Sequence, residues 1–299
     1  MSPKLLLSIA IALLAAPQSF AQAWVAPKGE IDVSLSYQFS DYLGHLNENG
    51  DKIHLGASRA HGLTLGVEYS FSDRFAVSAS LPFAATQNGK DDSPTSGHHG
   101  IDDGHYHSAW QDYHFEARYN VLTDPLVVTP FIGYVLPTHD YATIGEAGAG
   151  RDLQELHVGV NLGRLLDPAF PNTYFDVHLG YVFSEEAFGI STNRSMASLT
   201  LGHFFTPRYS ARLIADYQNT YGGLTSDYVF GTTIPEELFI EHDRLLQDDH
   251  FRMGFGGTMS VNEKLDVYLA YIQVISGANT HYGRGLSLGV SRTFGPSHH

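Results

Sequence analysis

The chain has 299 residues, with 17 Lys and Arg against 32 Asp and Glu, and a formal net charge of −15 at pH 7. This acidic balance argues against nucleic acid as a partner and leaves no polybasic membrane anchor. Cysteine is absent, which excludes a disulfide framework and a thiol nucleophile.

The first residues have the pattern of a secretory signal peptide. Lys4 supplies a basic start, and the apolar run at 5–16 is shorter than the roughly 20 residues of a membrane-spanning helix. Small residues at Ser19, Ala21 and Ala23 place the cleavage after Ala21 or after Ala23. We therefore expect export, with a signal peptide at 1–23 and a mature domain at 24–299.

The first strand is predicted at 30–43, where Ile31, Val33 and Leu35 alternate with polar residues. Because only a few residues separate it from the cleavage site, we expect no room for an N-terminal plug or hatch domain. The polar loop at 44–60 leads into the next strand pair.

The strongest signal is the stretch at 62–83, GLTLGVEYSFSDRFAVSASLPF. Leu63, Leu65 and Val67 alternate with small or polar residues, then a Ser-Asp-Arg turn reverses the chain. A period of two means that one face of the hairpin meets an apolar medium. Aromatic residues at both ends of the apolar row favour a face in lipid and a face in a lumen.

The same unit recurs along the chain. Further strands are predicted at 110–122, 126–137, 151–166, 173–184, 194–206, 210–221, 250–261, 265–275 and 284–294. The strand at 126–137 is mostly apolar, so its facing stays open. In the longest loop, at 222–249, Pro235 followed by Glu236 and Glu237 fits the start of a short helix, and continued strand fits equally well.

The count is twelve strands, with short and long connections alternating. This pattern predicts an all-β fold, a transmembrane antiparallel β-barrel of a bacterial outer membrane, with both termini in the periplasm. The alternative is a soluble β-sandwich or lipocalin-like barrel. Such a protein fills its interior with apolar side chains, which fits poorly with rows of charges on one strand face.

Three stretches carry a family resemblance: the hairpin above, WQDYHFEARYNVL, and FIGYVLPTHDYATIGEAGAGRDLQELHVGVNLG. Together they resemble the outer-membrane channels associated with the meta-pathway of phenol degradation, over about residues 28 to 294. The Pro-Thr-His-Asp stretch at 137–140 is similar to the family's Pro-Thr-Gly-Asp, with His139 where Gly is usual. The resemblance implies a barrel that passes aromatic or other hydrophobic compounds. The chain departs from the terminal aromatic residue common in such barrels, because Phe294 is followed by 295–299.

Charged and histidine side chains on the polar strand faces are candidates for a constriction. Such side chains select solutes by charge or, alternatively, form ion pairs that fill a narrow barrel, and the pattern favours neither. Strand direction places Asp216 in the periplasmic half and Arg252 nearer the outer end. The candidates are Glu68, Asp112, His114, Glu116, Arg118, Glu155, His157, Asp176, His178, Arg212, Asp216 and Arg252.

The loop at 87–108 contains His98, His99, His105 and His107 among aspartates. Histidine is a common ligand of zinc, copper and nickel, so this loop is a candidate metal site. The spacing matches no structured site, and a solvated polar loop is the alternative.

An outer-membrane hydrolase would need a Ser–His pair with an orienting third group on the lipid-facing side. His203 is the outward-facing strand histidine and lacks a Ser motif. We therefore expect a channel for passive passage of small molecules in a Gram-negative outer membrane, with no enzymatic activity, cofactor or nucleic acid. Expected partners are outer-membrane lipid and lipopolysaccharide, the barrel-assembly machinery and a small-molecule solute. The alternative is a closed barrel with a structural or surface-binding role.

Overall fold

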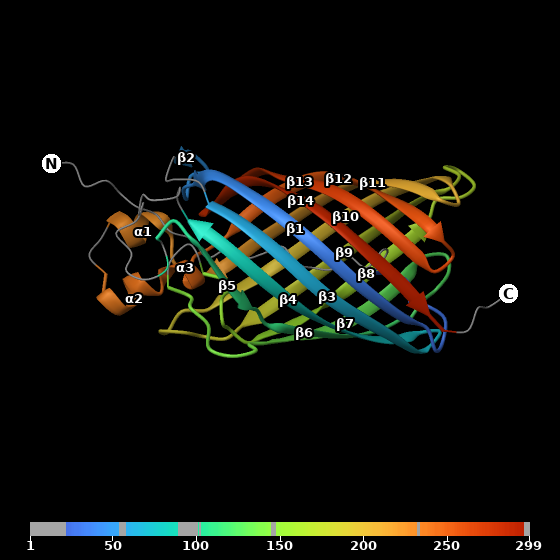
Figure 1. Cartoon of the computed structure of the whole chain (residues 1–299), viewed down its shortest axis with the longest axis horizontal. Helices are drawn as coiled ribbons and strands as arrows, with labels where there is room; N and C mark the ends of the chain where they lie inside the picture. Colours follow the sequence, from blue (N-terminus) through green and yellow to red (C-terminus); the bar gives the residue numbers. More distant parts are fainter. Residues whose placement is uncertain are drawn as a thin grey trace.

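The computed structural model describes residues 22–53, 58–88, 101, 103–144, 148–231 and 234–295. They form a closed antiparallel β-barrel (Figure 1). Of the fourteen strands, β2 (Lys52–Ile53) is a two-residue spur on β1, and β5 (Tyr106–Trp110) and β6 (Tyr113–Tyr119) succeed one another along β4. Twelve strands therefore form the wall, which confirms the predicted fold class.

The wall strands follow chain order, each hydrogen-bonded to the next. Most boundaries lie within a few residues of the predicted ones. The remaining wall strands are β1 (Ile31–Leu46), β3 (Ser58–Ser72), β4 (Phe75–Asn88), β7 (Val127–Leu136), β8 (Glu155–Leu165), β9 (Thr173–Ser184), β10 (Thr192–Thr206), β11 (Tyr209–Gly222), β12 (Asp249–Asn262), β13 (Leu265–Ala278) and β14 (Thr280–Phe294).

The barrel closes where β1 pairs with β14. The register runs from Ile31 opposite Phe294 to Leu46 opposite Thr280, with one irregularity between Tyr42 and Gly44. Because this seam pairs the first strand with the last, the wall has no free strand edge. Closure removes the unpaired backbone groups that an open sheet would present to lipid.

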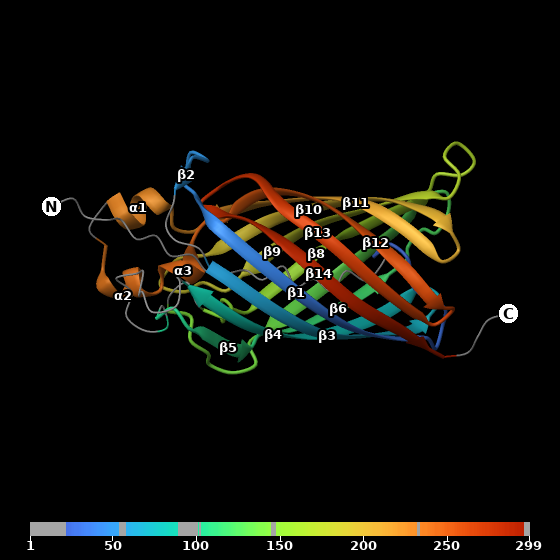
Figure 2. The ribbon, with the colours of Figure 1, turned by 45° about the horizontal axis from the view of Figure 1, so that its top comes forward.

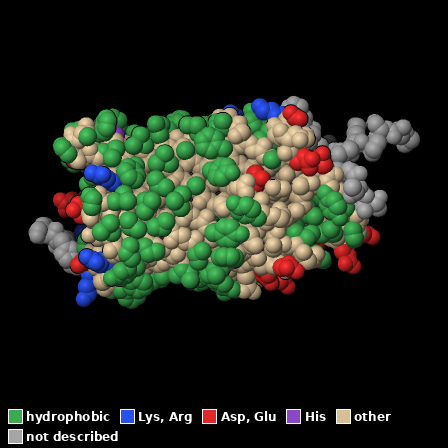
Figure 3. Space-filling model, turned by 180° about the vertical axis from the view of Figure 1, so that it is seen from behind, with side chains coloured by type: hydrophobic (Ala, Val, Ile, Leu, Met, Phe, Trp, Pro, Cys, Tyr) green, Lys and Arg blue, Asp and Glu red, His purple; other side chains and the backbone are tan. Residues whose placement is uncertain are grey.

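Side chains alternate between the two faces of the wall as predicted. In β3, Leu65 is 49% exposed on the outside, while Thr64 is buried on the inside. Apolar side chains cover the wall, and charged ones gather mainly toward its ends (Figure 3). In β7, whose facing the sequence left open, Thr129 and Phe131 point inward and Ile132 outward.

The two ends of the barrel differ. Short turns and Phe294 lie at one end, while longer loops and the helices α1 (Ser226–Gly231), α2 (Glu236–Ile240) and α3 (His242–Leu245) lie at the other (Figures 1 and 2). Of the two alternatives after Pro235, the helix is present. In outer-membrane barrels the short turns are periplasmic, so we call these the inner and outer ends.

One predicted outer loop is wrong. The chain at 276–283 was expected to be a loop, but β13 and β14 continue to Ala278 and Thr280, with Asn279 alone between them at φ 50°. Asparagine tolerates this left-handed conformation better than most residues, which allows so tight a reversal. None of the helices in the described part of the chain is long and apolar enough to cross a membrane.

The position of a residue along the wall predicts how much a lipid-facing arginine at that residue lowers the stability of the barrel. Leu65 lies near the middle of β3, whereas Val67 lies closer to the inner aromatic residue Tyr69. We expect Leu65→Arg to lower the free energy of unfolding by about 2–4 kcal/mol and Val67→Arg by less, because the cost falls toward the interface. Equilibrium unfolding in lipid vesicles measures both. Equal costs would contradict this placement of the membrane centre.

Candidate functional site

The segment before β1 enters the lumen near the inner end. Ala23 is fully buried, and its backbone N–H donates to Asp176 Oδ2 (2.9 Å). Its carbonyl oxygen accepts from Asn120 Nδ2 (2.8 Å) and from the Thr129 hydroxyl. The segment at 22–29 therefore places a short peptide inside the barrel, which the prediction of no plug or hatch domain did not anticipate.

Gly163 in β8 makes space for this segment. A Cβ atom added there would lie 2.5 Å from the Trp24 ring and 2.6 Å from Ala23 Cβ, closer than real Cβ atoms approach. The wall is thus hollowed where the segment rests. Of the two expected cleavage positions, only the one after Ala21 leaves Ala23 in the mature chain to make these contacts.

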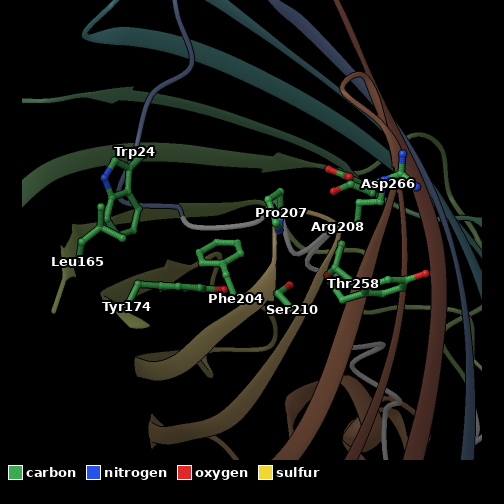
Figure 4. Close-up of a pocket in the computed structure, with 11 residues that line it drawn as sticks. Trp24, Leu165, Tyr174, Phe204, Pro207, Arg208, Ser210, Thr258 and Asp266 are labelled. Carbon is green, nitrogen blue, oxygen red and sulfur yellow. The ribbon is translucent and has the colours of Figure 1, made fainter. Parts of the chain in front are cut away.

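Aromatic side chains surround a pocket of about 220 Å³ at the inner mouth. Trp24 packs edge-on against Tyr174, with ring centroids 6.3 Å apart, and Tyr174 lies 5.4 Å from Phe204. These rings gather at one side of the pocket, and Arg208 and Asp266 lie at the other (Figure 4). The pocket therefore combines an apolar wall with charged groups.

Two tyrosines lie flat across the inner wall over glycines. The Tyr174 ring covers Gly202, and the Tyr268 ring covers Gly289. Arg212, one of the predicted lumen residues, lies between them, 5.7 Å from the Tyr268 centroid. Large side chains next to glycines let neighbouring strands share a narrow interior.

The predicted lumen residues nearest this level have partners inside the barrel. Arg118 Nη2 lies 2.6 Å from Glu68 Oε1, and both side chains are largely enclosed. His178 Nδ1 lies 2.7 Å from Asn161 Oδ1, and its ring stacks on Phe131 at 4.7 Å. A buried carboxylate and guanidinium in contact offset the cost of removing each charge from water.

Glu155 is the centre of one of two four-residue ionic clusters in the described part of the chain. Arg194 contacts both its carboxylate oxygens, at 2.8 and 2.6 Å, in the bidentate geometry that arginine favours. His157 Nε2 and Arg151 Nη1 lie 3.0 and 3.4 Å from the same carboxylate. Arg151 also donates from Nε to the carbonyl oxygen of Arg244 in the outer helices, so the lumen cluster is tied to the outer end.

A second cluster contains Asp216 and Arg252. Sequence reasoning placed them in different halves, and that is wrong: they are opposed across β11 and β12, and Arg252 Nε donates to Asp216 Oδ1 at 2.9 Å. His250 bridges Asp216 and Asp248, at 3.5 and 3.1 Å. Burial alone would raise the pKa of Asp248, but His250 beside it brings that pKa well below its ordinary value.

Loops cover the outer end. The Tyr141 hydroxyl, from the loop after β7, donates to Asp112 at 2.7 Å. Burial, together with Asp112, raises the pKa of this phenol. Leu224, Leu245 and neighbouring apolar residues form a small core among the helices. Ser226 donates to Asn279 Oδ1 at 2.9 Å, which ties the helices to the tight β13–β14 reversal.

Two further predicted lumen residues on β6 lie in register with predicted lumen residues on β8. Glu116 and His157 flank Gly133 across three neighbouring strands. His114 occupies the equivalent row one step outward, beside Val135 and Glu155. The structure thus brings six of the twelve candidates into ion pairs or charged clusters, namely Glu68, Arg118, Glu155, His157, Asp216 and Arg252, and the twelve do not form one ring of a single sign.

Of the candidate metal ligands, His98 and His99 lie outside the described residues. His107 Nε2 lies 2.9 Å from Asp103 Oδ1, whose pKa the hydrogen bond from His107 lowers. Within the described ranges, no group of three or more His, Asp or Glu side chains has the geometry to hold a metal ion. The metal hypothesis therefore stays a prediction for this loop.

In the described strands, His203 and His61 face outward, and neither forms the Ser–His pair that the hydrolase hypothesis requires. His203 Nδ1 contacts the Thr173 hydroxyl at 2.9 Å. His61 was missed because its strand begins earlier than predicted. It contacts the hydroxyls of Tyr37 and Tyr106, at 2.7 and 3.1 Å. Both histidines therefore contact hydroxyl groups of tyrosine or threonine, not of serine.

Known structures are similar to this chain in fold. The COG4313 outer membrane channel from Pseudomonas putida F1 matches 91% of this chain and 98% of its own, with TM-score 0.70 and 13% identity. The translocator domain of the autotransporter NalP from Neisseria meningitidis matches 90% of both chains, with TM-score 0.52 and 10% identity. No family model and no curated protein matches the sequence. The likeness shows the fold, and the resemblance to the phenol-pathway channels stays a prediction.

The contact between Gly163 and the N-terminal segment can be tested with Trp24 as the reporter. In a Trp110→Phe background, Gly163→Ala is expected to displace the segment and to increase acrylamide quenching of Trp24 fluorescence. Gly285→Ala is the control, because a Cβ there meets ordinary contacts of 3.4 Å or more. Equal quenching in all three proteins would mean that the segment does not rest on Gly163.

Proposed function

We propose that the protein resides in the outer membrane and is a gated channel for small molecules. The proposal rests on one observation: the interior of the wall is polar and charged, while its obstructions are segments that are not part of the wall. Residues 22–29 obstruct the inner end, and the loops with α1–α3 cover the outer end. Such segments can move while every backbone hydrogen bond of the wall stays in place.

The likeness in fold to an outer membrane channel supports this proposal, as does the resemblance in sequence. The lumen charges are of mixed sign and several form ion pairs, which argues against strong selection for cations or anions. The mature chain of this proposal starts at Gln22, after cleavage at Ala21, so that Ala23 keeps its three hydrogen-bond contacts with the lumen wall.

Aromatic or other hydrophobic solutes are the proposed cargo. The support in this chain is the inner pocket, whose volume of about 220 Å³ and aromatic lining suit a single ring. Because Trp24 belongs to the N-terminal segment, a solute in this pocket contacts the element that obstructs the lumen. Binding there would compete with the packing of Trp24 on Tyr174.

Single-channel recording in planar bilayers tests the channel. The refolded chain starting at Gln22 is compared with one starting at Glu30, which lacks the segment, and with Gly163→Ala. We expect rare or small conductance steps from the first protein and larger, longer openings from the other two, because the obstruction is removed or displaced. Gly285→Ala should behave like the unmodified chain.

A closed barrel with a structural or surface-binding role is the second candidate. The enclosed Glu155 cluster favours it, because four side chains meet in the lumen and fill space. Absence of conductance from all four proteins, with folding intact by heat-modifiable migration, would support this role and contradict the channel.

The proposed cargo predicts a spectroscopic signal. Phenol is expected to change Trp24 fluorescence in the Trp110→Phe protein in a saturable manner, whereas cyclohexanol, with no aromatic ring, has a weaker effect. Phe204→Ala should weaken the response because it removes an aromatic wall of the pocket. A linear, unsaturable response to both compounds would contradict binding at this site.

A further inference from the structure

A ladder of charged side chains lies on the outward face near the outer end. Asp41 of β1 stands opposite Arg59 of β3 on one side and Arg284 of β14 on the other. Arg59 Nε lies 3.6 Å from Asp41 Oδ1, and Arg284 Nη2 lies 3.1 Å from Oδ2. Asp41 is 16% exposed, whereas the two arginine side chains are 57% and 56% exposed. The guanidinium groups therefore share one sheltered carboxylate and keep donors free on the outside.

Lys52 adds a third cation. Its Nζ lies 3.8 Å from the centre of the Tyr282 ring, and Tyr282 stands two residues from Arg284 on the same strand. We define the basic patch as Lys52, Arg59 and Arg284 with Asp41; its formal charge is about +2. The chain as a whole is strongly acidic.

The other basic residues described at this end are engaged elsewhere. Arg151 and Arg194 bind Glu155 inside the barrel, and Arg252 binds Asp216. Arg244 Nε contacts Glu241 among the helices at 2.8 Å. Positive charge described on the outward face of the outer end is thus concentrated on β2, β3 and β14, next to β1. Glu48 and Asp51 lie in the turn after β1, beyond Arg59 and Arg284, and Asp51 directly precedes Lys52.

The height of the patch matches the edge of the apolar band. Arg59 precedes the inner aromatic residue Tyr69 by ten positions, and Arg284 precedes Phe294 by ten. At about 3.3 Å per residue and a tilt of about 40°, ten residues rise roughly 25 Å, the height of the lipid-facing band in such barrels. The Tyr37–His61–Tyr106 contacts lie beside the patch, as expected of an interfacial aromatic girdle.

This position and charge suit a phosphate. Guanidinium groups bind phosphate oxygens in a bidentate manner, and lysine adds a point charge. The ion pairs of the ladder contribute little to stability by themselves, because exposed pairs lose side-chain entropy and are screened by water and salt. Lipopolysaccharide, the lipid of the outer leaflet, presents phosphates on its lipid A sugars at this height.

We propose that Lys52, Arg59 and Arg284 bind a lipid A phosphate of lipopolysaccharide. The proposal assumes the outer-membrane location proposed above, but it does not need an open channel. A barrel that conducts nothing would still bind, so failure of the channel and failure of this site are distinguishable.

The test is titration of the refolded protein, in detergent, with fluorescent bis-phosphorylated lipid A. Arg59→Gln with Arg284→Gln should weaken binding roughly tenfold or more, because charge-assisted hydrogen bonds to phosphate are lost. Arg164→Gln with Arg292→Gln is the matched control: both residues are exposed on the outward face at the inner end, and binding should not change. Equal affinity of all three proteins would overturn the proposal.

Further measurements identify which chemical group of the lipid is bound. Dephosphorylated lipid A should bind the unmodified chain as weakly as bis-phosphorylated lipid A binds the double variant. Inorganic phosphate should not displace lipid A at equal concentration, and displacement would reassign the patch as a general anion site. Asp41→Asn should retain binding. If Asp41→Asn lost as much binding as the double arginine variant, the ion pairs would serve only to hold the strands together. That result would overturn the proposal.

Heat-modifiable migration checks folding of each variant. If the double arginine variant does not fold, Lys52→Gln replaces it, because Lys52 lies on the two-residue spur outside the wall. A several-fold loss of affinity is then expected. Unchanged affinity of a folded Lys52→Gln protein for lipid A would remove Lys52 from the site and contradict the proposal as stated.

Discussion

The structure depends on one constraint: backbone groups in an apolar medium must find partners within the chain. A sheet meets this constraint only when its first strand pairs with its last, as β1 does with β14 over the length of both strands. Once the wall is closed, the alternation of side chains along each strand decides which of them face lipid and which face the lumen. One set of side chains faces lipid and must be apolar, and the other set faces a narrow interior that it has to fill.

The interior is filled by complementarity of size and charge. Tyrosines lie over glycines at the inner end, and Glu68, Glu155 and Asp216 each contact a guanidinium group. Because these partners come from different strands, each pair also fixes the register of its strands. The same side chains that make the lumen polar therefore hold the wall strands in place, which explains why charge is abundant inside and balanced in sign.

Strand alternation made the wall predictable from sequence, because period two is a local property that residues such as Leu63, Leu65 and Val67 display directly. Contacts between side chains in the lumen were not predictable, because the stagger of neighbouring strands cannot be read from the sequence of a single strand. This is why Asp216 and Arg252 were placed apart although they touch. The partners of the predicted residues, including Arg194, His250 and Asp248, were missed for the same reason. Ala23 and Trp24 carry no periodic signal, and only the glycine at 163 hints at a neighbour.

The route of the N-terminal segment has a mechanical consequence. Followed backwards from the start of β1, the segment crosses the interior. It forms hydrogen bonds with residues of β7 and β9 and with the residue just after β6, on the side of the barrel opposite β1. A cylinder made only of strands can flatten into an oval with little change in its hydrogen bonds. A peptide fixed to both walls acts as a cross-brace against that deformation. Removal of the segment from the lumen would open the passage and also take away this brace. The width of the opened barrel would then depend on the flexibility of its wall.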